Sequence, residues 1–169
     1  MVNEFIYAEL ERNAEVIRQL LSGLDEATFR WRSAEGKWNL LDVICHFYDE
    51  EIEDFRARVK LLLEDPTQRW VKILPAQWPE ERNYQNENFE QRINDFAAER
   101  EKSVEWLRSL ENPKWDNGFE HPKAGFVSAQ LVLDNWLAHD LLHIRQIIRI
   151  KYEYLKAYAN NPLDYAGDW

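Results

Sequence analysis

Two histidines, His139 and His143, lie four residues apart in the apolar, helix-forming segment LAHDLLHIRQI, residues 137–147. Residues four apart on a helix lie one above the other, so both imidazole rings point in one direction. This spacing can hold a metal ion, and Gln146 or Asn135 could hydrogen-bond near it. Two hydrogen-bonded core histidines would show the same spacing. The pair alone does not separate a metal site from a structural one.

A third histidine, His46, lies in the segment CHFYDEE, inside a helix predicted to begin after Asn39. Two histidines from one helix and one from a facing helix would make a three-histidine metal site with open positions for water or substrate. Asp49 and Glu50 follow His46 by three and four residues, so both can share its face. Either carboxylate could orient a ligand, act as a fourth ligand or serve as a general base. Alternatively, the charge run DEEIED, residues 49–54, is a solvated face.

The remaining histidine and the single cysteine have weaker claims to a site. His121 lies in the breaker-rich segment GFEHPKAG, where a surface-loop histidine is the simpler interpretation and an acid/base group at the end of the bundle is the alternative. Cys45 precedes His46 directly, but neighbours on a helix point about 100° apart. We therefore expect Cys45 to be a buried, unreactive thiol.

Four helical segments must position these residues. Apolar side chains at helical spacing predict helices over about residues 3–21, 40–64, 87–110 and 128–158. Asn39 and Ser128 are suitable N-caps, while Gly23 and Pro66 follow predicted helix ends. Few strand signals accompany these helices, so the sequence predicts an all-α four-helix bundle forming one domain over residues 1–169. The long connections after the second and third helices allow a non-sequential arrangement of the helices.

The connection over residues 65–86 is long and rich in aromatic side chains. It carries three prolines together with Trp70, Trp78 and Tyr84. Long connections in compact domains are often functional, and aromatic residues are enriched at interfaces. We expect this segment to form a pocket wall or a dimer contact.

Composition limits the partners of the chain. Its 169 residues are 45 % hydrophobic and carry a net charge of −10, which argues against nucleic acid as a partner. The single cysteine excludes a framework of internal disulfides and fits a reducing compartment. The charged N-terminal stretch does not resemble a signal peptide, and no apolar run is long enough to span a membrane. We expect a cytoplasmic protein.

Two stretches resemble the DinB/YfiT-like superfamily. They are EGKWNLLDVICHFYDEE, residues 35–51, and HPKAGFVSAQLVLDNWLAHDLLHIRQI, residues 121–147. The resemblance implies a four-helix bundle in which His46, His139 and His143 bind a divalent metal ion, commonly zinc or nickel. It also implies a choice of activities, because characterised members include thiol-dependent transferases and a few hydrolases or isomerases.

These residues are compatible with several functions. We favour an S-transferase, in which a low-molecular-weight thiol is the cosubstrate and its sulfur attacks a small-molecule electrophile. A hydrolase would instead activate water, with Glu50 or Asp49 as the base. A non-enzymatic metal-binding stress-response protein, forming a homodimer through its aromatic surface, and a purely structural bundle are the other readings. Because imidazole ligands must be neutral, we expect metal affinity to weaken as the pH falls through about 6.5.

Overall fold

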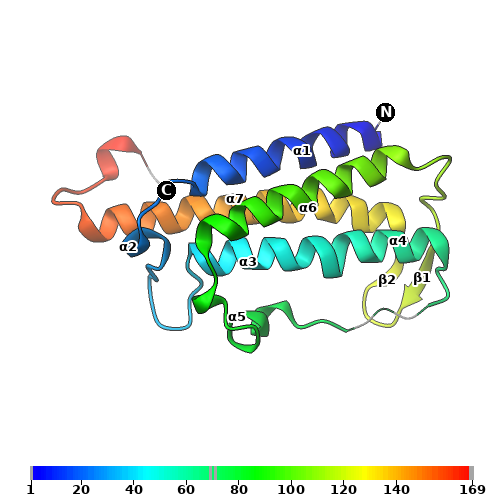
Figure 1. The fold of residues 1–169 in the computed structure, drawn as a ribbon, viewed down its shortest axis with the longest axis horizontal. Helices are drawn as coiled ribbons and strands as arrows, with labels where there is room; N and C mark the ends of the chain where they lie inside the picture. The colour runs from blue at the N-terminus through cyan, green and yellow to red at the C-terminus, as the bar shows by residue number, and fades with distance from the viewer. Residues whose placement is uncertain (1, 69, 71, 168–169) are drawn as a thin grey trace.

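The computed structural model describes residues 2–68, 70 and 72–167 and shows a bundle of four long helical units (Figure 1). The first unit is α1 (Val2–Leu21), and the third and fourth are α6 (Phe89–Ser109) and α7 (Ala129–Tyr158). The second unit is continuous but changes its winding, from α3 (Leu40–Glu50) through a π-helical turn, η1 (Glu51–Phe55), into α4 (Arg56–Glu64). These bounds confirm the prediction of an all-α four-helix bundle.

The helices begin where side chains can satisfy the free backbone N–H groups of the first turn. The Asn39 side chain accepts a hydrogen bond from the Asp42 N–H, and Asp42 accepts one from the Asn39 N–H, both at 2.9 Å. Ser128 Oγ accepts from the Leu131 N–H at 3.1 Å at the start of α7. The two N-caps predicted from the sequence are therefore confirmed.

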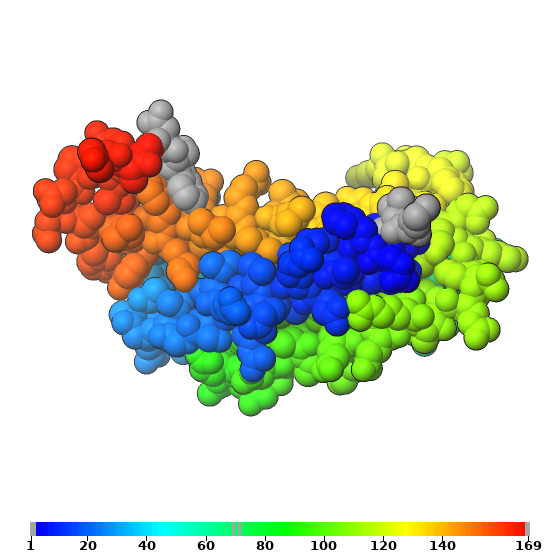
Figure 2. Space-filling view, turned by 90° about the horizontal axis from the view of Figure 1, so that it is seen from above, coloured from blue at the N-terminus to red at the C-terminus, as the bar shows by residue number. Residues whose placement is uncertain are grey.

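The order of the helices around the bundle is not their order in the chain. Both α6 and α7 pack against α1 and also against the α3–α4 unit. The first two long helices therefore lie on opposite sides of the bundle, as the long connections allow (Figure 1). The C-terminal end of α7 projects beyond the end of α1 (Figure 2). In the described part of the chain, no helix is both long and apolar enough to cross a membrane.

A β-hairpin occupies the breaker-rich segment before α7, where the sequence analysis expected only an irregular connection. Strands β1 (Gly118–His121) and β2 (Gly125–Ser128) pair antiparallel. A Cβ atom at Gly118 would lie 2.3 Å from the Val127 carbonyl oxygen, so the pairing requires glycine there. Strands of four residues are too short to show a clear alternating pattern, which is why the sequence did not reveal them.

Short helical turns interrupt the other connections. They are α2 (Glu26–Phe29), η2 (Pro75–Gln77), α5 (Trp78–Glu81), η3 (Tyr84–Asn86) and, after α7, η4 (Asp164–Ala166). The connection over residues 65–86 contains three of them, η2, α5 and η3, and of these α5 and η3 pack against α3. This packing brings part of the aromatic connection to the face of α3 that carries His46.

Candidate metal centre

The structure brings the three predicted histidines together between α3 and α7. His46 comes from α3, while His139 and His143 lie one helical turn apart on α7. The Nε2 atoms of His46 and His139 are 3.1 Å apart. One ring nitrogen from each of the three residues lies within 4.8 Å of the other two. The i, i+4 pair and the facing-helix histidine thus form one cluster.

This donor set fits a divalent metal ion. Zinc–imidazole distances of about 2.0–2.1 Å place two nitrogen ligands roughly 3.4 Å apart in a tetrahedral site. The distance between His46 Nε2 and His139 Nε2 is close to this value. The three donor atoms all lie within 4.8 Å of one another, so only a small inward movement of the side chains would bring them to one ion. Three imidazoles without a carboxylate or thiolate would leave at least one coordination position open.

Hydrogen bonding prepares His143 as a ligand. Its Nδ1 atom lies 2.6 Å from Gln146 Oε1. An amide oxygen can only accept, so Nδ1 carries the proton and Nε2 keeps its lone pair. Outer partners of this kind fix the ring and the tautomer of metal-binding histidines. Gln146 thus makes the hydrogen bond expected for it, whereas Asn135 is exposed and donates to the Leu131 carbonyl oxygen of its own helix.

Burial keeps the rings neutral. It lowers the pKa of His46 to about 3 and that of His139 to about 2, with the neighbouring His143 contributing to both shifts. Burial also lowers the pKa of His143. A buried imidazolium loses its hydration, which explains the direction of each shift. The nitrogen lone pairs are therefore available to a metal ion well below neutral pH.

Glu50 lies behind His46, on the side away from His139. Its Oε1 atom is 3.9 Å from His46 Nδ1, while His46 Nε2 faces His139. Nδ1 is buried and has no hydrogen-bond partner within the described residues. Burial and the neighbouring Asp54 carboxyl raise the pKa of Glu50. A small movement of the Glu50 carboxyl group toward His46 would let it accept a hydrogen bond from Nδ1 and orient the ring.

Asp49 turns toward the aromatic connection. Its Oδ2 atom accepts a hydrogen bond from the Tyr84 hydroxyl at 2.6 Å and pairs with Arg82 at 2.9 Å. These contacts hold the connection against α3. Of the two acids expected near the metal, Asp49 is half-buried and Glu50 is buried. Only Glu50 faces a histidine.

Aromatic rings enclose the cluster. The ring centroids of Trp38 and His46 are 4.9 Å apart, and Trp78 lies 6.3 Å from His46. Phe55 lies 4.9 Å from the His139 ring. Trp78 therefore belongs to the wall of the site, as expected of the connection over residues 65–86. Trp70 does not, because it packs against the hairpin residue Phe119.

One edge of the cluster is accessible from outside. His143 lines an open groove of about 810 Å³ along α7, together with Leu142, Arg145, Gln146 and Arg149. The Arg149 guanidinium pairs with Glu153. This groove gives small molecules an approach to the His143 side of the site.

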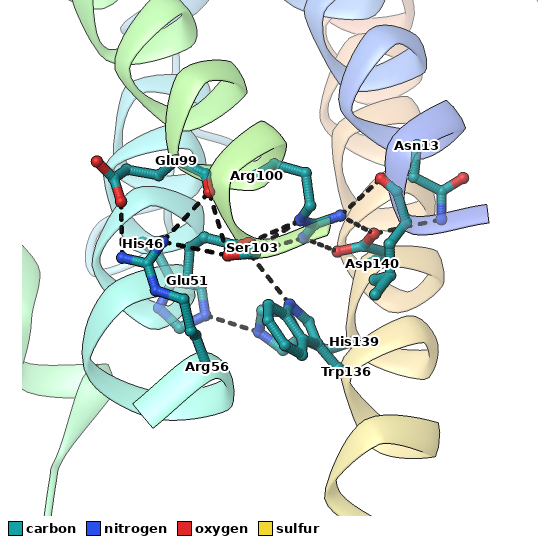
Figure 3. Close-up of polar contacts among 11 residues, drawn as sticks. Asn13, His46, Glu51, Arg56, Glu99, Arg100, Ser103, Trp136, His139 and Asp140 are labelled. Carbon is teal, nitrogen blue, oxygen red and sulfur yellow. Dashed lines mark hydrogen bonds and ion pairs between the residues drawn. The ribbon is translucent and has the colours of Figure 1, made fainter. Parts of the chain in front are cut away.

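A buried ionic network lies beside the histidines (Figure 3). Arg100 on α6 reaches between Glu51 and Asp140, and Trp136 donates to Glu51 at 3.1 Å. Asn13 on α1 donates to Asp140 at 3.3 Å, so all four helical units take part. The sequence did not predict this network. An arginine at helical spacing within the apolar stripe of α6 was the available signal, since a buried cation requires an acidic partner.

The π-helical turn explains why adjacent acids are both buried. Glu50 points to His46, and Glu51, the next residue, points to Arg100. Consecutive α-helical residues point about 100° apart, and the wider turn of a π-helix changes which residues face inward. A regular helical pattern therefore did not predict that Glu51 is buried.

Cys45 and His121 lie outside the cluster. Cys45 is 1 % exposed, and burial raises the pKa of its thiol, in agreement with the expected unreactive thiol. His121 ends β1 and accepts hydrogen bonds at Nδ1 from the Lys123 and Ala124 N–H groups. It is therefore a hairpin residue rather than a free loop histidine.

Comparison with known proteins gives two findings. The chain matches the family model of the DinB superfamily over residues 9–147. It is also similar to the solved structure of YfiT from Bacillus subtilis, described as a probable metal-dependent hydrolase with an unusual four-helix bundle topology. The TM-score is 0.79 at 18 % sequence identity, over 90 % of this chain and 87 % of that chain. None of the curated proteins matches the chain.

Proposed function

The chain belongs to the DinB superfamily, and from this premise we propose that it is a divalent-metal-dependent enzyme acting on a small molecule. We propose His46, His139 and His143 as the ligands of a zinc or nickel ion. The observation that carries the proposal is the cluster of three neutral imidazoles, with donor atoms within 4.8 Å of one another. A purely structural role would not require one buried and two half-buried rings that share so few hydrogen bonds.

The residues of the chain would prepare this site before any substrate arrives. Gln146 keeps the proton of His143 on Nδ1. The Glu50 carboxyl group lies close enough that a small shift would let it accept a hydrogen bond from His46 Nδ1. Aromatic rings exclude water from the buried side, which strengthens electrostatic interactions there. A divalent ion bound to such a site lowers the pKa of a coordinated thiol or water and so supplies a nucleophile at neutral pH.

Between thiol and water, the positions of the acids favour a thiol. Glu50 faces the Nδ1 side of His46 rather than the Nε2 side, and Asp49 is engaged by Tyr84 and Arg82. Neither position supports a general base next to the open coordination position. A thiol ionised by the metal needs no such base. We therefore propose an S-transferase: a low-molecular-weight thiol loses its S–H proton to solvent, its sulfur bonds to an electrophilic carbon, and the leaving group departs with its bonding electrons.

A hydrolase is the second candidate. YfiT, which shares this fold, is described as a probable metal-dependent hydrolase. In that case Glu50, the nearest carboxyl group to the histidines, would take the proton from water after a rearrangement. A non-enzymatic metal-binding protein would bind the ion without turnover, so activity must be tested together with metal content.

The first experiment measures metal stoichiometry. Metal-free protein is reconstituted with zinc or nickel, dialysed and analysed by elemental mass spectrometry. We expect one ion per chain, and less than about 0.1 after His139→Ala. His121→Asn is the matched control, since this histidine lies outside the cluster, and should retain the full amount. Full metal content in His139→Ala would refute the proposed ligands.

The second experiment separates the two reactions at equal metal content. We expect thiol-dependent turnover with an aryl halide such as 1-chloro-2,4-dinitrobenzene, retained within about tenfold in Glu50→Gln. If the protein instead hydrolyses activated esters and Glu50→Gln lowers that rate by about 10²–10⁴-fold, Glu50 is a base and the hydrolase is correct. Metal binding with neither activity would support the non-enzymatic protein.

A further inference from the structure

A pocket separate from the histidine cluster lies at the hairpin end of the bundle. Its volume is about 1080 Å³, and it is bounded by the hairpin, by the segment after α4 and by Arg58 of α4. Trp70, Phe119 and Val127 supply apolar walls. The residues that line it include none of the three histidines of the cluster and none of the residues of the α7 groove. It is therefore a second candidate site.

One of the residues that line this pocket carries an unsatisfied donor. Trp70 Nε1 is buried and has no hydrogen-bond partner in the described part of the chain, although its ring packs on Phe119 at 5.1 Å and under the Arg58 guanidinium at 4.4 Å. A buried N–H without an acceptor destabilises the folded state, because it has lost the hydrogen bond that it makes to water in the unfolded chain. Native structures rarely retain such a group unless a water or a ligand satisfies it.

His121 adds a second donor to the same pocket. Its Nδ1 atom accepts hydrogen bonds from two backbone N–H groups, those of Lys123 and Ala124. A neutral imidazole that accepts at Nδ1 carries its proton on Nε2, so Nε2 is a donor. The tautomer is fixed by the hairpin turn itself. Trp70, whose Nε1 has no partner among the described residues, and His121, whose Nε2 is a donor, therefore line the same pocket.

The charges around the pocket favour an anion. Lys72 and Arg58 line it, against one acidic residue, Glu120. Lys72 forms no hydrogen bond or ion pair with any described residue, whereas Arg58 pairs with Asp54 at 2.5 Å. Lys72 is thus the lining cation without an ion pair among the described residues, in a chain whose net charge is −10. A protein of this overall charge repels anions unless a local cation attracts them.

We propose that the pocket binds a small molecule with an apolar or aromatic body and an anionic end. The apolar walls would cover the body, and Trp70 Nε1, His121 Nε2 and Lys72 would contact the anion. The proposal does not depend on the metal or on the reaction at the histidines. It accounts for Trp70 and His121, two residues that the histidine site leaves without a role.

The probe is 8-anilinonaphthalene-1-sulfonate, and its matched control is N-phenyl-1-naphthylamine, which has the same rings without the sulfonate. Each is titrated into ¹⁵N-labelled protein, and the indole N–H resonances are followed by NMR. We expect a saturable shift of the Trp70 indole signal, identified by its loss in Trp70→Phe. Because a hydrogen bond to a charged group is worth roughly 1.5–3 kcal/mol, the sulfonate should bind at least about tenfold more tightly than the uncharged dye.

Three variants test the contacts. Trp70→Phe keeps an aromatic ring and removes the donor, and His121→Asn keeps an acceptor for the turn and removes Nε2. Each should weaken sulfonate binding about tenfold and change binding of the uncharged dye less than about twofold. Lys72→Gln should weaken it about two- to fivefold, an effect that salt reduces. Lys102→Gln, on an exposed part of α6, should have no effect.

Other outcomes would overturn the proposal. Equal affinity for the two dyes would refute the anionic part, and resonance shifts confined to the α7 groove would refute the pocket. Unchanged binding in both Trp70→Phe and His121→Asn would refute the contacts. His139→Ala separates this proposal from the metal site, since it should abolish metal binding and leave sulfonate binding unchanged. Loss of both would show that the two sites are one.

Discussion

Replacing Arg100 by methionine should destabilise the protein strongly, because Arg100 is the only cation in the described part of the buried network. Its side chain is 2 % exposed, and those of Glu51 and Asp140 are 1 % and 0 % exposed. The guanidinium donates to Asp140 at 2.6 and 2.8 Å, to Glu51 at 2.9 Å and to the Leu10 carbonyl oxygen at 2.9 Å. Methionine fills most of the apolar stem but replaces none of these hydrogen bonds.

The size of the effect follows from what remains after the substitution. Two buried carboxyl groups lose their cation, and among the described residues each keeps one donor, Trp136 for Glu51 and Asn13 for Asp140. Removing one partner of a buried ion pair costs about 3–5 kcal/mol of unfolding free energy. Domains of this kind are typically stable by about 5–15 kcal/mol, so Arg100→Met should remove a large part of the stability.

The pH dependence distinguishes an unpaired charge from lost packing. Burial raises the pKa of Asp140, and Arg100 opposes this shift. Without Arg100 the folded-state pKa of Asp140 rises further above its unfolded value, so the folded variant takes up a proton that the unfolded chain does not. Its stability then increases as the pH falls. The difference between the variant and the natural protein should therefore shrink by about 1–2 kcal/mol between pH 7 and pH 5.

Urea denaturation followed by circular dichroism measures the unfolding free energy, with equal m-values as the condition for comparison. Arg108→Met is the matched control, because Arg108 pairs with Glu11 at the surface, with side chains 42 % and 59 % exposed. That change should cost no more than about 1 kcal/mol. A loss in Arg100→Met as small as in the control, or one that does not change with pH, would refute the reasoning.

Three further predictions concern the start of α3 and the histidines. Asn39→Ala removes a buried capping box and should lower the unfolding free energy by about 1–2 kcal/mol in the same urea assay, whereas an unchanged midpoint would contradict the capping role. Because the folded-state pKa values of His46 and His139 lie far below 6.5, the unfolded chain takes up protons first as the pH falls. Each histidine should thus lower metal-free stability by about 1 kcal/mol between pH 6.5 and 5.5, and His139→Asn should remove about half of their joint effect. Because these pKa values are lowered, the affinity for metal should weaken only at a pH below the value of 6.5 expected from the sequence. Competition with a chelator at several pH values measures this affinity.

The local features of this protein could be predicted from its amino-acid sequence. Apolar spacing and capping residues such as Asn39 and Ser128 located the helices, because helix formation depends on neighbours three and four residues apart. The same periodicity placed His139 and His143 on one face. His46 could be assigned to the cluster because its motif and that of α7 resemble one family, which the match over residues 9–147 confirms.

The tertiary structure decided everything that depends on how distant segments meet. Periodicity does not say which faces of two helices pack together, so the burial of Arg100 between Glu51 and Asp140 could not be read from either segment. The π-helical turn shifts the inward face within α3–α4, a change too small to alter the apolar pattern. The sequence favoured Glu50 over Asp49 as the acid near His46 but could not show the partners of either, because packing between distant segments turned Asp49 to Tyr84 and Glu50 to His46.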